Sequence, residues 1–506
     1  MRVSATSYLT AIITAVFSVF FFCSCNVPET VPTSTPAPEQ TTENIPATTP
    51  TPKPTPTVTP KPEYLDISPE EVIGAKLILV YDSDGRSEEK ITELADLFNE
   101  ENDLGITIIA VHGTDAEIRE ILEGNNAQKT DILIADSALL RSPETHTPHF
   151  IDLSGFLDSQ EYAFVSDEAN AIMPIMLEAE NQNGKYYALP LWAEPAFLFY
   201  NKTWAIELGY DDTPTDLTTF AEQVCAAGKA NYAEKDNNKH GTGGWLISSD
   251  ATGVLSWMLV FAQDGEHPSD FFHSETGEVF TDTASWLRDL YDNGCAWNSR
   301  VKEPYDYFAN RYALFYSGTY SDAERQFNAF AQSESYSFDN WDLIPYPVKT
   351  NGSKDDPRIY ADMISIAIPD NMDARQANAA WQFIRWLYSE KHAAEVALSA
   401  NGWPVQDNEE ITTLYRKSGK DKLYQTLSYR QYFVNNNADE NWLTSRMILS
   451  DGFSYVFNPS AKPEDIPEIW KQIGDVIDEI NSVNNNSENN TFDTTIETGV
   501  KNETQS

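Results

Sequence analysis

The stretch that decides the fold is GKYYALPLWAEPAFLFYNK, residues 184–202. Its first part, residues 186–191, is rich in side chains that favour β-strands. Its last part, Phe197-Leu-Phe-Tyr200, is an unbroken apolar run, which is typical of a strand that is buried on both faces. The pattern therefore predicts two strands in close succession.

The segment between these two strands is constrained. Pro190 and Pro195 each lack a backbone N–H donor and fix φ, so neither suits the interior of a central strand. Trp192 and Glu194 stand between the prolines and, two residues apart on an extended chain, point the same way. The stretch thus predicts a strand, a short proline-bounded break and a second strand. We interpret it as a crossing between two domains, with its middle facing the cleft between them.

The composition limits the kinds of partner. The chain has 506 residues, enough for two or more domains, and its 78 acidic and 34 basic residues give a formal net charge of −44. A nucleic-acid partner is disfavoured, because phosphate binding requires clusters of Lys and Arg. Docking on anionic lipid through a basic patch is disfavoured for the same reason. We expect a solvated acidic surface. Aromatic residues make up 12% of the chain, and side chains of this size require a large core or a ligand site.

Residues 1–25 are typical of a lipoprotein signal peptide. Arg2 provides the positive start, and residues 8–22 form an apolar stretch that is too short and too early for a spanning helix. The segment ends in Phe22-Cys-Ser-Cys25, which resembles a bacterial lipobox, where a small residue precedes the cysteine that receives diacylglycerol. Cys25 is therefore the predicted lipidation site of an exported protein anchored to the outer face of the bacterial cell membrane. The alternative is a secreted protein with an ordinary cleavage site.

Two further segments are predicted to be disordered. Residues 26–70 are dominated by Pro and Thr and cannot bury enough apolar surface to offset their ordering entropy. We expect them to form a stiff, polyproline-like spacer between the anchor and the folded body. Residues 482–506 form a polar, Asn-rich tail with the same limitation.

The folded body opens with alternating strand and helix patterns. Apolar β runs and amphipathic helical patterns follow one another at residues 76–81, 88–99, 105–111, 116–123 and 131–135. This alternation favours a parallel sheet with helices on both faces. Ligands bind beyond the carboxyl ends of the strands in such sheets, which selects the loop 82–86, with Asp82 and Asp84, and the loop 136–139. An Asp after a strand is also often only a turn former or helix cap.

Later segments follow a recognisable order. Residues 313–320 are typical of an apolar strand that stops at a Gly. Two further strands are predicted at residues 341–347 and 359–369, and a Gly-Trp-Pro turn lies in residues 401–406. Together with the stretch 184–202, they resemble the family 1 extracellular solute-binding proteins. These are the binding components of ABC importers, and the maltodextrin-binding proteins are familiar members. The resemblance covers residues 76–480.

The resemblance implies an α/β, two-lobed periplasmic-binding-protein-like fold, with parallel-type sheets flanked by helices and a hinge of several crossings. The first lobe is expected at residues 71–193 and 341–370, and the second at residues 194–340 and 371–481. The implied function is to bind a sugar or oligosaccharide in an interlobe cleft that closes on the ligand. The implied partners are the solute and the transmembrane subunits of an ABC permease. A monomer without cofactor, metal or chemical step is expected.

Candidate ligand contacts follow from the chemistry of sugars, which stack on aromatic faces and donate hydroxyl hydrogen bonds to carboxylates. The position of Glu194 matches a ligand-contacting glutamate of the maltodextrin-binding relatives. Tyr320 matches an aromatic that the family presents at a strand end, and Asp362 lies on a strand that returns near the cleft. The remaining candidates are four Trp and two Asp residues: Trp192, Trp245, Trp257, Trp403, Asp82 and Asp84. A Trp at helical spacing is more often a core residue.

Two functional alternatives and one structural question stay open. A polyamine or other cationic solute also suits acidic and Trp side chains, through charge and cation–π contacts. A secreted glycoside hydrolase needs two carboxylates about 5–10 Å apart, and no local signature singles out such a pair. The sequence contains no Gly-x-Ser-x-Gly and no His-Glu-x-x-His motif. Cys225 and Cys295 could be joined in an exported protein, but sequence offers no distance between them.

Overall fold

The structure is a computed structural model that describes residues 63–82, 85–122, 129–141, 150–235, 237–248, 250–262, 278–299, 303–349, 357–389, 391–434 and 442–476. The predicted signal peptide with Cys25, the predicted tail and Asp84 lie outside the described residues. Within those residues, no helix is both long enough and apolar enough to cross a membrane.

The end of the predicted spacer belongs to the folded body. Residues 63–70 contribute to two short 3₁₀ helices, η1 (Glu63–Asp66) and η2 (Pro69–Val72). Tyr64 stacks on Phe156 with ring centroids 4.7 Å apart, and its carbonyl accepts a hydrogen bond of 3.1 Å from Asn378. The expectation of disorder up to residue 70 is therefore wrong at this end, because Tyr64 and Leu65 supply apolar surface that the Pro/Thr repeats lack.

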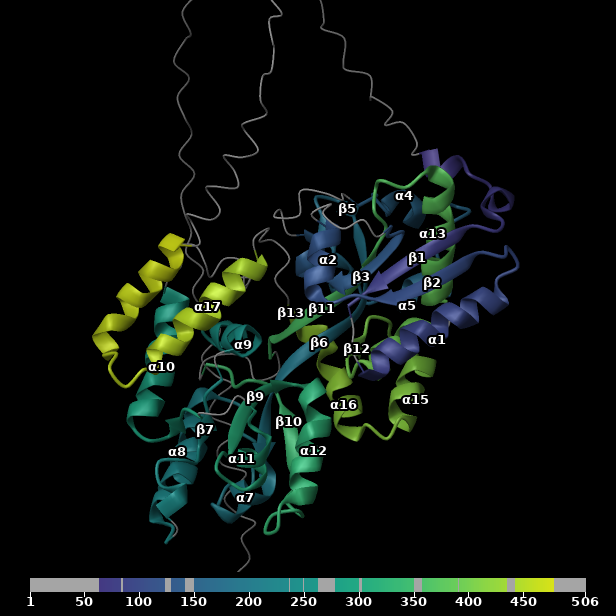
Figure 1. Cartoon of the computed structure of the whole chain (residues 1–506). Helices are drawn as coiled ribbons and strands as arrows, with labels where there is room; N and C mark the ends of the chain where they lie inside the picture. Colours follow the sequence, from purple (N-terminus) through teal and green to yellow (C-terminus); the bar gives the residue numbers. More distant parts are fainter. Residues whose placement is uncertain are drawn as a thin grey trace, which may run out of the picture. The chain divides into compact units, whose positions relative to one another are not determined.

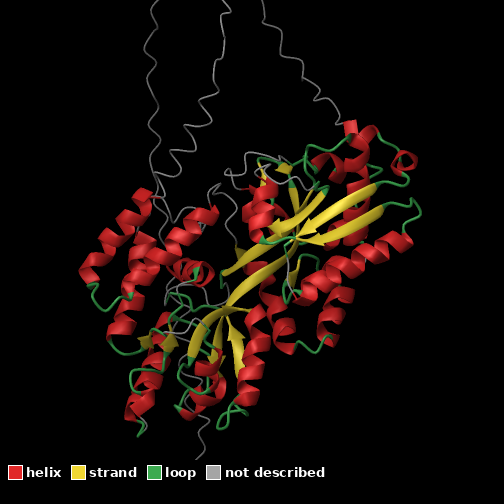
Figure 2. Ribbon diagram, viewed as in Figure 1, coloured by secondary structure: helices red, strands yellow, loops and turns green. Residues whose placement is uncertain are grey.

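One mixed sheet runs through the described part of the chain in the order β2-β1-β3-β11-β6-β9-β7-β8 (Figures 1 and 2). At one end β1 (Lys76–Tyr81), β2 (Thr107–His112) and β3 (Ile132–Asp136) are parallel. At the other end β7 (Trp245–Leu246), β8 (Ala296–Trp297) and β9 (Phe315–Thr319) are also parallel. We call the part built on β1, β2 and β3 the first lobe, and the part built on β7, β8 and β9 the second lobe.

Two long antiparallel strands connect the lobes. They are β6 (Ala188–Asn201) and β11 (Ile359–Ala367). β11 pairs with β3 of the first lobe, and β6 pairs with β9 of the second lobe. Three short strands join the same sheet at its middle: β10 (Trp341–Ile344) and β12 (Trp403–Pro404) pair with β6, and β13 (Phe433–Val434) pairs with β11.

The proline-bounded break predicted inside the stretch 184–202 is wrong, since β6 is one continuous strand of 14 residues. The prolines lie where the ladder is already interrupted. Leu191 is bypassed between the pairs Trp192–Ile364 and Pro190–Ser365, which makes a bulge. Pro195 is the last residue of β6 paired with β11, and the next residue pairs with β9. Missing N–H donors are tolerated at such positions.

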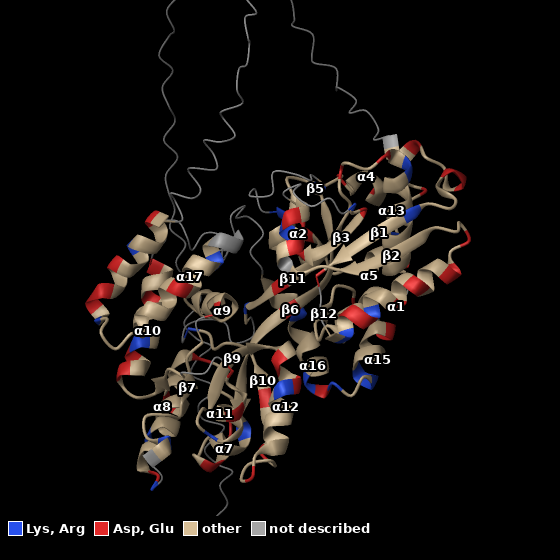
Figure 3. Cartoon of the chain, viewed as in Figure 1, with Lys and Arg blue, Asp and Glu red and all other residues tan. Residues whose placement is uncertain are grey.

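Helices cover both lobes. The first lobe carries α1 (Gly85–Glu101), α2 (Asp115–Leu122), α3 (Ser137–Arg141), α4 (Ser154–Leu157), α5 (Ser166–Ala171), α6 (Pro174–Glu178) and the hairpin β4 (Asn181–Gln182) and β5 (Lys185–Tyr186). The second lobe carries α7 (Lys202–Glu207), α8 (Leu217–Ala233), η3 (Asn237–Lys239), α9 (Ala251–Phe261), α10 (Glu278–Asp292), α11 (Tyr305–Ala309), η5 (Tyr320–Asp322) and α12 (Ala323–Gln332). Figure 3 shows acidic residues spread over helices such as α1, α2, α10 and α12, as expected for a solvated surface.

The C-terminal helices divide between the lobes. In order they are α13 (Ala374–Tyr388), α14 (His392–Ser399), α15 (Glu409–Lys417), α16 (Asp421–Thr426), η6 (Leu427–Tyr432), α17 (Trp442–Val456) and η7 (Pro463–Asp465). Phe383 of α13 packs edge-on against Phe98 of α1, with ring centroids 5.2 Å apart, and α14 also packs on α1. We therefore group α13 and α14 with the first lobe, which differs from the sequence-based boundary at residue 371. α17 packs on α9 and α10 of the second lobe.

The apolar run of residues 197–200 is buried on both faces, as predicted. Phe197 and Phe199 belong to the apolar cluster that extends into the first lobe, and Leu198 and Tyr200 belong to the main cluster of the second lobe. All four side chains are almost completely buried. This double burial explains why the strand lacks the alternation of polar and apolar residues that a half-exposed strand shows.

A disulfide joins Cys225 of α8 to Cys295, which directly precedes β8. The sequence could not show whether these two cysteines are bonded, because they are 70 residues apart. In the fold their Cα atoms are 4.2 Å apart, since α8 packs beside β8. The bond closes a loop that contains α9 and α10, so it restricts the unfolded second lobe.

Reduction of this disulfide should destabilise the protein. Closing a loop of this length removes chain entropy from the unfolded state, so we expect a free-energy loss of about 2–4 kcal/mol. Denaturant unfolding with and without a thiol reductant measures the loss. A variant with both Cys225→Ala and Cys295→Ala is the control and should not respond to the reductant. An equal response of this variant would contradict the assignment.

Candidate ligand-binding site

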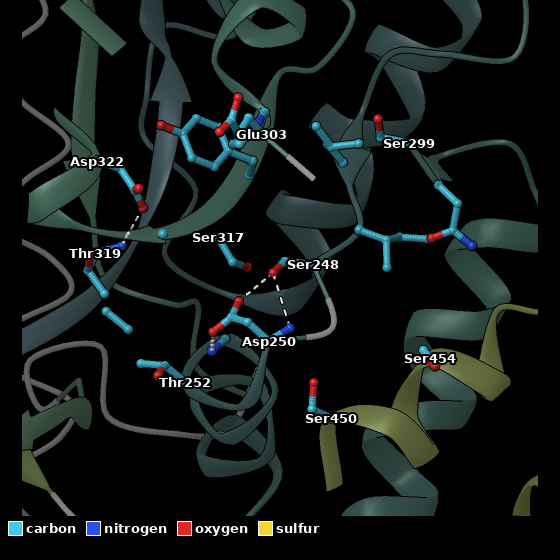
Figure 4. Close-up of a pocket in the computed structure, with 18 of the residues that line it drawn as sticks. Ser248, Asp250, Thr252, Ser299, Glu303, Ser317, Thr319, Asp322, Ser450 and Ser454 are labelled. Carbon is cyan, nitrogen blue, oxygen red and sulfur yellow. Dashed lines mark hydrogen bonds between the residues drawn. The ribbon is translucent and has the colours of Figure 1, made fainter. Parts of the chain in front are cut away.

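A cavity of about 760 Å³ lies in the second lobe (Figure 4). It opens beyond the carboxyl ends of the parallel strands β7, β8 and β9, which is where open α/β sheets bind their ligands. The loop after each of these strands contributes to its wall, and β6 and α17 close its sides. The same rule selected loops of the first lobe from the sequence, whereas the cavity lies at the corresponding edge of the second lobe.

The wall of the cavity is rich in oxygen atoms. Its carboxylates are Asp250, Glu303, Asp322 and Asp451, its hydroxyl and amide side chains are Ser248, Thr252, Asn298, Ser299, Ser317, Thr319, Ser450 and Ser454, and its aromatic rings are Tyr305, Tyr316 and Phe457. None of the described residues that line it is Lys, Arg or His. Such a wall provides many partners for hydroxyl groups and no counter-charge for an anion.

Two of these carboxylates are held in place by helix starts. Asp250 caps α9 by accepting the backbone N–H of Gly253 at 3.1 Å, and it also accepts the hydroxyl of Ser248 (Figure 4). Asp322 accepts the Tyr305 hydroxyl at 2.6 Å and the backbone N–H of Thr319 at 3.0 Å. These bonds fix the orientation of both carboxylates before any ligand arrives.

The environment of Asp322 is tight. A Cβ atom at Gly318 would lie 2.6 Å from Asp322 Oδ2, so the glycine at the end of β9 makes room for this carboxylate. Burial raises the pKa of Asp322, and the charge of Asp250 raises it further, although the bonds from Tyr305 and Thr319 lower it. The hydroxyl of Tyr316 is buried at the same wall without a hydrogen-bond partner among the described residues. Buried polar groups are normally paired, so this hydroxyl is an exception in the core beneath the wall.

Three of the sequence candidates meet where β6 and β11 cross. Glu194 lies directly opposite Asp362 in the antiparallel register, so their side chains are neighbours on one face of the sheet. The indole Nε1 of Trp192 donates to Glu194 Oε1 at 3.4 Å. Ala196, two residues further along β6 on the same face, lines the cavity. Glu194 and Asp362 do not line the cavity themselves, but Asp362 accepts a hydrogen bond of 3.0 Å from Thr252, which does.

Sequence reasoning missed the partner of Asp362. Arg446 of α17 binds this carboxylate through two hydrogen bonds of 3.0 and 3.2 Å and also donates to Thr252, a cavity residue, at 2.9 Å. No local motif marks Arg446, because it lies in an ordinary helical pattern 84 residues after Asp362. Only the packing of α17 on α9 brings it to the site.

All four Trp candidates and Tyr320 are buried, and Trp192 is only 2% exposed. Trp245 and Trp257 have no exposed surface and pack edge-on, with ring centroids 5.4 Å apart, in the core of the second lobe. Trp403 is also fully buried, and its Nε1 donates to Thr426 at 2.9 Å. Burial raises the pKa of Tyr320 to about 12, and the backbone at Leu423 is its hydrogen-bond partner. This burial favours the core-packing alternative that the sequence left open for the Trp residues.

The candidates in the first lobe stand apart from the cavity. Asp82 follows β1, is partly exposed, and its backbone N–H donates to the carbonyl of Ile134 at 3.0 Å. Asp136 ends the neighbouring strand β3, so both lie at the carboxyl edge of the parallel sheet. Within the described residues, no group of three or more His, Cys, Asp or Glu side chains is arranged to hold a metal ion.

Residues 93–413 match the family described as bacterial extracellular solute-binding protein. The match spans more than half of the 506 residues, and the chain belongs to this family of exported binding proteins. The family membership predicted from the motif order is thus confirmed. No curated protein sequence matches the chain.

Solved structures share the two-lobed fold. The cyclic α-maltosyl-1,6-maltose binding protein from Arthrobacter globiformis is 16% identical, with a TM-score of 0.61 over 80% of this chain and 98% of that one. The sugar-binding protein MalE from Xanthomonas citri is 15% identical, with a TM-score of 0.62 over 81% and 99%. An ABC substrate-binding protein from Listeria monocytogenes in complex with cycloalternan is 16% identical, with a TM-score of 0.59 over 81% and 99%. At these identities the likeness shows the fold, which confirms the predicted α/β architecture.

The contact between Trp192 and the turn before β12 should tolerate no extra atom. A Cβ at Gly402 would lie 2.6 Å from Trp192 Cδ1 and 3.1 Å from the Ala193 carbonyl. We expect Gly402→Ala to lower the free energy of unfolding by about 1–3 kcal/mol and to change the near-ultraviolet circular dichroism of tryptophan.

Gly474→Ala is the matched control for Gly402→Ala. Gly474 lies in a helix, and a Cβ there would meet nothing within 4 Å. Its replacement should stabilise the protein by about 0.5–1 kcal/mol, because alanine favours a helix more than glycine does. Equal effects of the two substitutions would show that Trp192 is not held by this contact.

Proposed function

We propose that this chain is the substrate-binding lipoprotein of an ABC importer and that it binds a neutral sugar or oligosaccharide between its lobes, without a chemical step. The observation that carries the proposal is the wall of the cavity, which combines four carboxylates, eight hydroxyl or amide side chains and three aromatic rings. Hydroxyl-rich ligands need this combination of acceptors, donors and apolar faces. The family and the sugar-binding proteins of the same fold support it.

The electrostatics of the cavity disfavour an anionic ligand. An anionic saccharide would meet carboxylates and no Lys, Arg or His among the described lining residues. A cationic solute would need carboxylates that are free to pair with it. Asp250 and Asp322 already accept hydrogen bonds from backbone N–H groups and hydroxyls, which offset part of their charge. Glu303 and Asp451 would still attract a cation, so a polyamine is the weaker candidate mainly because solved structures of the same fold are sugar-binding proteins.

The proposed contacts run from the cavity to the crossing strands. Asp250, Asp322 and Tyr305 would bind hydroxyl groups at the end of the ligand in the second lobe. Glu194 would accept a hydroxyl near the hinge, oriented by the indole N–H of Trp192 at 3.4 Å. This assignment keeps Glu194 and Trp192 from the sequence candidates and adds residues from the loops after β7 and β9.

Ligand binding would close the lobes about the crossing strands. Closure can follow only if the closed arrangement makes contacts with the ligand that the open one does not make. Groups at the carboxyl edge of the first lobe, such as Asp82, would supply these contacts. The lobes would move as rigid bodies and β6 and β11 would act as the hinge, a common mode of closure around a ligand. The closed surface would then be recognised by the permease.

Calorimetric titration of the full chain tests the ligand class. Its panel contains maltotriose, mannotriose, a cyclic glucan, trigalacturonate and spermidine. We expect at least one neutral oligosaccharide to bind and the anionic trisaccharide to bind at least tenfold more weakly than its best neutral counterpart. For that ligand, Glu194→Ala should raise Kd at least tenfold, a loss of about 1.4 kcal/mol.

Glu178→Ala is the control for Glu194→Ala, because Glu178 is an exposed carboxylate of the first lobe and should not affect binding. An unchanged Kd for Glu194→Ala would remove this residue from the site. Salt-dependent binding of spermidine, with none of the saccharides, would overturn the proposed ligand class.

The location of the protein is proposed to depend on Cys25. Membership of an extracellular binding-protein family supports export, and the lipobox-like end of the signal segment supports a lipid anchor. The Pro/Thr-rich residues 26–62 would then act as an extended spacer, rising roughly 3.1 Å per residue and holding the lobes on the order of 100 Å from the membrane.

Detergent-phase partitioning of protein expressed in a bacterial host tests the anchor. We expect the wild-type protein in the detergent phase and Cys25→Ala in the aqueous phase, because the diacylglycerol is attached through the thiol. Cys23→Ala is the matched control and should behave like the wild type. Partitioning of Cys25→Ala into detergent would contradict the assignment.

A further inference from the structure

A charged cluster lies beside the cavity. Arg446 donates from Nη1 to Asp362 Oδ1 at 3.0 Å and from Nη2 to Asp362 Oδ2 at 3.2 Å. Thr252 accepts from Nη2 at 2.9 Å and donates to Asp362 Oδ2 at 3.0 Å. Asp362 also accepts the Tyr360 hydroxyl at 3.2 Å, and Asp136 Oδ2 lies 3.9 Å from Arg446 Nη1. We call these five residues the Arg446 cluster.

The Arg446 cluster joins the two lobes. Arg446 and Thr252 come from α17 and α9, which pack on each other in the second lobe (Figure 1). Asp136 ends β3 of the first lobe, and Asp362 lies on the crossing strand β11. Ala138 of α3 belongs to the apolar core of the second lobe, and α3 packs on α17. The cluster therefore sits at a direct contact between the lobes.

Negative charge exceeds positive charge in this cluster. Asp136 and Asp362 share one guanidinium, and the paired bonds of Arg446 go to Asp362. Asp136 is left with the longer ion pair and with the backbone N–H of Ala138, which it accepts at 2.8 Å. The other titratable groups that face Asp136 are Glu180 and Tyr360 on β11.

The surroundings of Asp136 favour its neutral form. Burial and then the charge of Asp362 raise its pKa to about 7, although Arg446 and the bond from Ala138 lower it. A carboxyl group with a raised pKa binds its proton more tightly in this arrangement than in an unfolded chain. The protonated Asp136 carboxyl group therefore contributes to the free energy of unfolding below about pH 4. This contribution is lost as the pH rises through about 7.

We propose that Arg446 is a positioning residue of the ligand site and that the charge of Asp136 regulates it. When Asp136 is neutral, Arg446 holds Asp362 of the crossing strand and the cavity residue Thr252 together beside the interlobe contact. When Asp136 is ionised, it competes for the guanidinium and repels Asp362, which loosens the contact. The proposal rests on the proposed function only through Thr252, because the Arg446 cluster forms without a ligand.

The test uses the ligand-free full chain, so that failure of a sugar to bind leaves it intact. Thermal unfolding and small-angle X-ray scattering are compared at about pH 5.5 and about pH 8.5. For the wild type we expect the melting temperature to fall on the order of 3 °C with rising pH, and the radius of gyration to increase. Asp136→Asn, which resembles the neutral carboxyl group, should remove most of both changes.

Asp96→Asn is the control, because Asp96 is an exposed carboxylate on α1 and its replacement removes the same charge from the first lobe. It should keep the pH dependence of the wild type. Equal pH dependence in Asp136→Asn and the wild type would overturn the proposal.

Arg446→Met provides a second test that does not depend on the folding of Asp136→Asn. Without the guanidinium, an ionised Asp136 faces Asp362 with no counter-charge. We therefore expect this variant to lose more thermal stability at about pH 8.5 than at about pH 5.5. Arg446→Lys, which keeps the charge, should restore part of the difference. Equal losses at both pH values would mean that Arg446 only fills space.

Discussion

The antiparallel pairing of β6 with β11 is the constraint on which the rest of the structure depends. β6 pairs with β11 over residues 188–195 and with β9 from residue 196 onward, so one strand belongs to the sheets of both lobes. Its backbone hydrogen bonds must be satisfied on both sides of the change of partner. This requirement places the bulge and Pro195 at the interruption of the ladder, and it sets Glu194 opposite Asp362.

The polar groups near the crossing are positioned by a second requirement, which is that buried charges need partners. Asp250 and Asp322 are held by the starts of helices, and Asp362 is held by Arg446 and Thr252. These bonds orient the side chains before a ligand is present. Asp136 shares the Arg446 guanidinium with Asp362 and has the longer contact with it. The raised pKa of Asp136 is the basis of the proposed regulation of the contact between the lobes.

Much of the fold could be predicted because its signals are local. The strands of the first lobe follow from short apolar runs, and the double burial of residues 197–200 follows from the absence of alternation. The break in β6 was predicted wrongly, because the rule for proline concerns an intact ladder and the sequence does not show where a ladder is interrupted. Trp245 and Trp257 were candidates for the site by residue type, but residue type does not distinguish a cavity wall from a core.

The sequence by itself determined the family and the alternation of strands and helices, since these depend on residues close together or in a fixed order. The tertiary structure alone decided the disulfide, the position of the cavity and the contact between Arg446 and Asp362. Each of these joins residues from distant elements: 70 residues separate the two cysteines and 84 separate Asp362 from Arg446. Contacts of this kind arise from helix packing, which one sequence does not specify residue by residue.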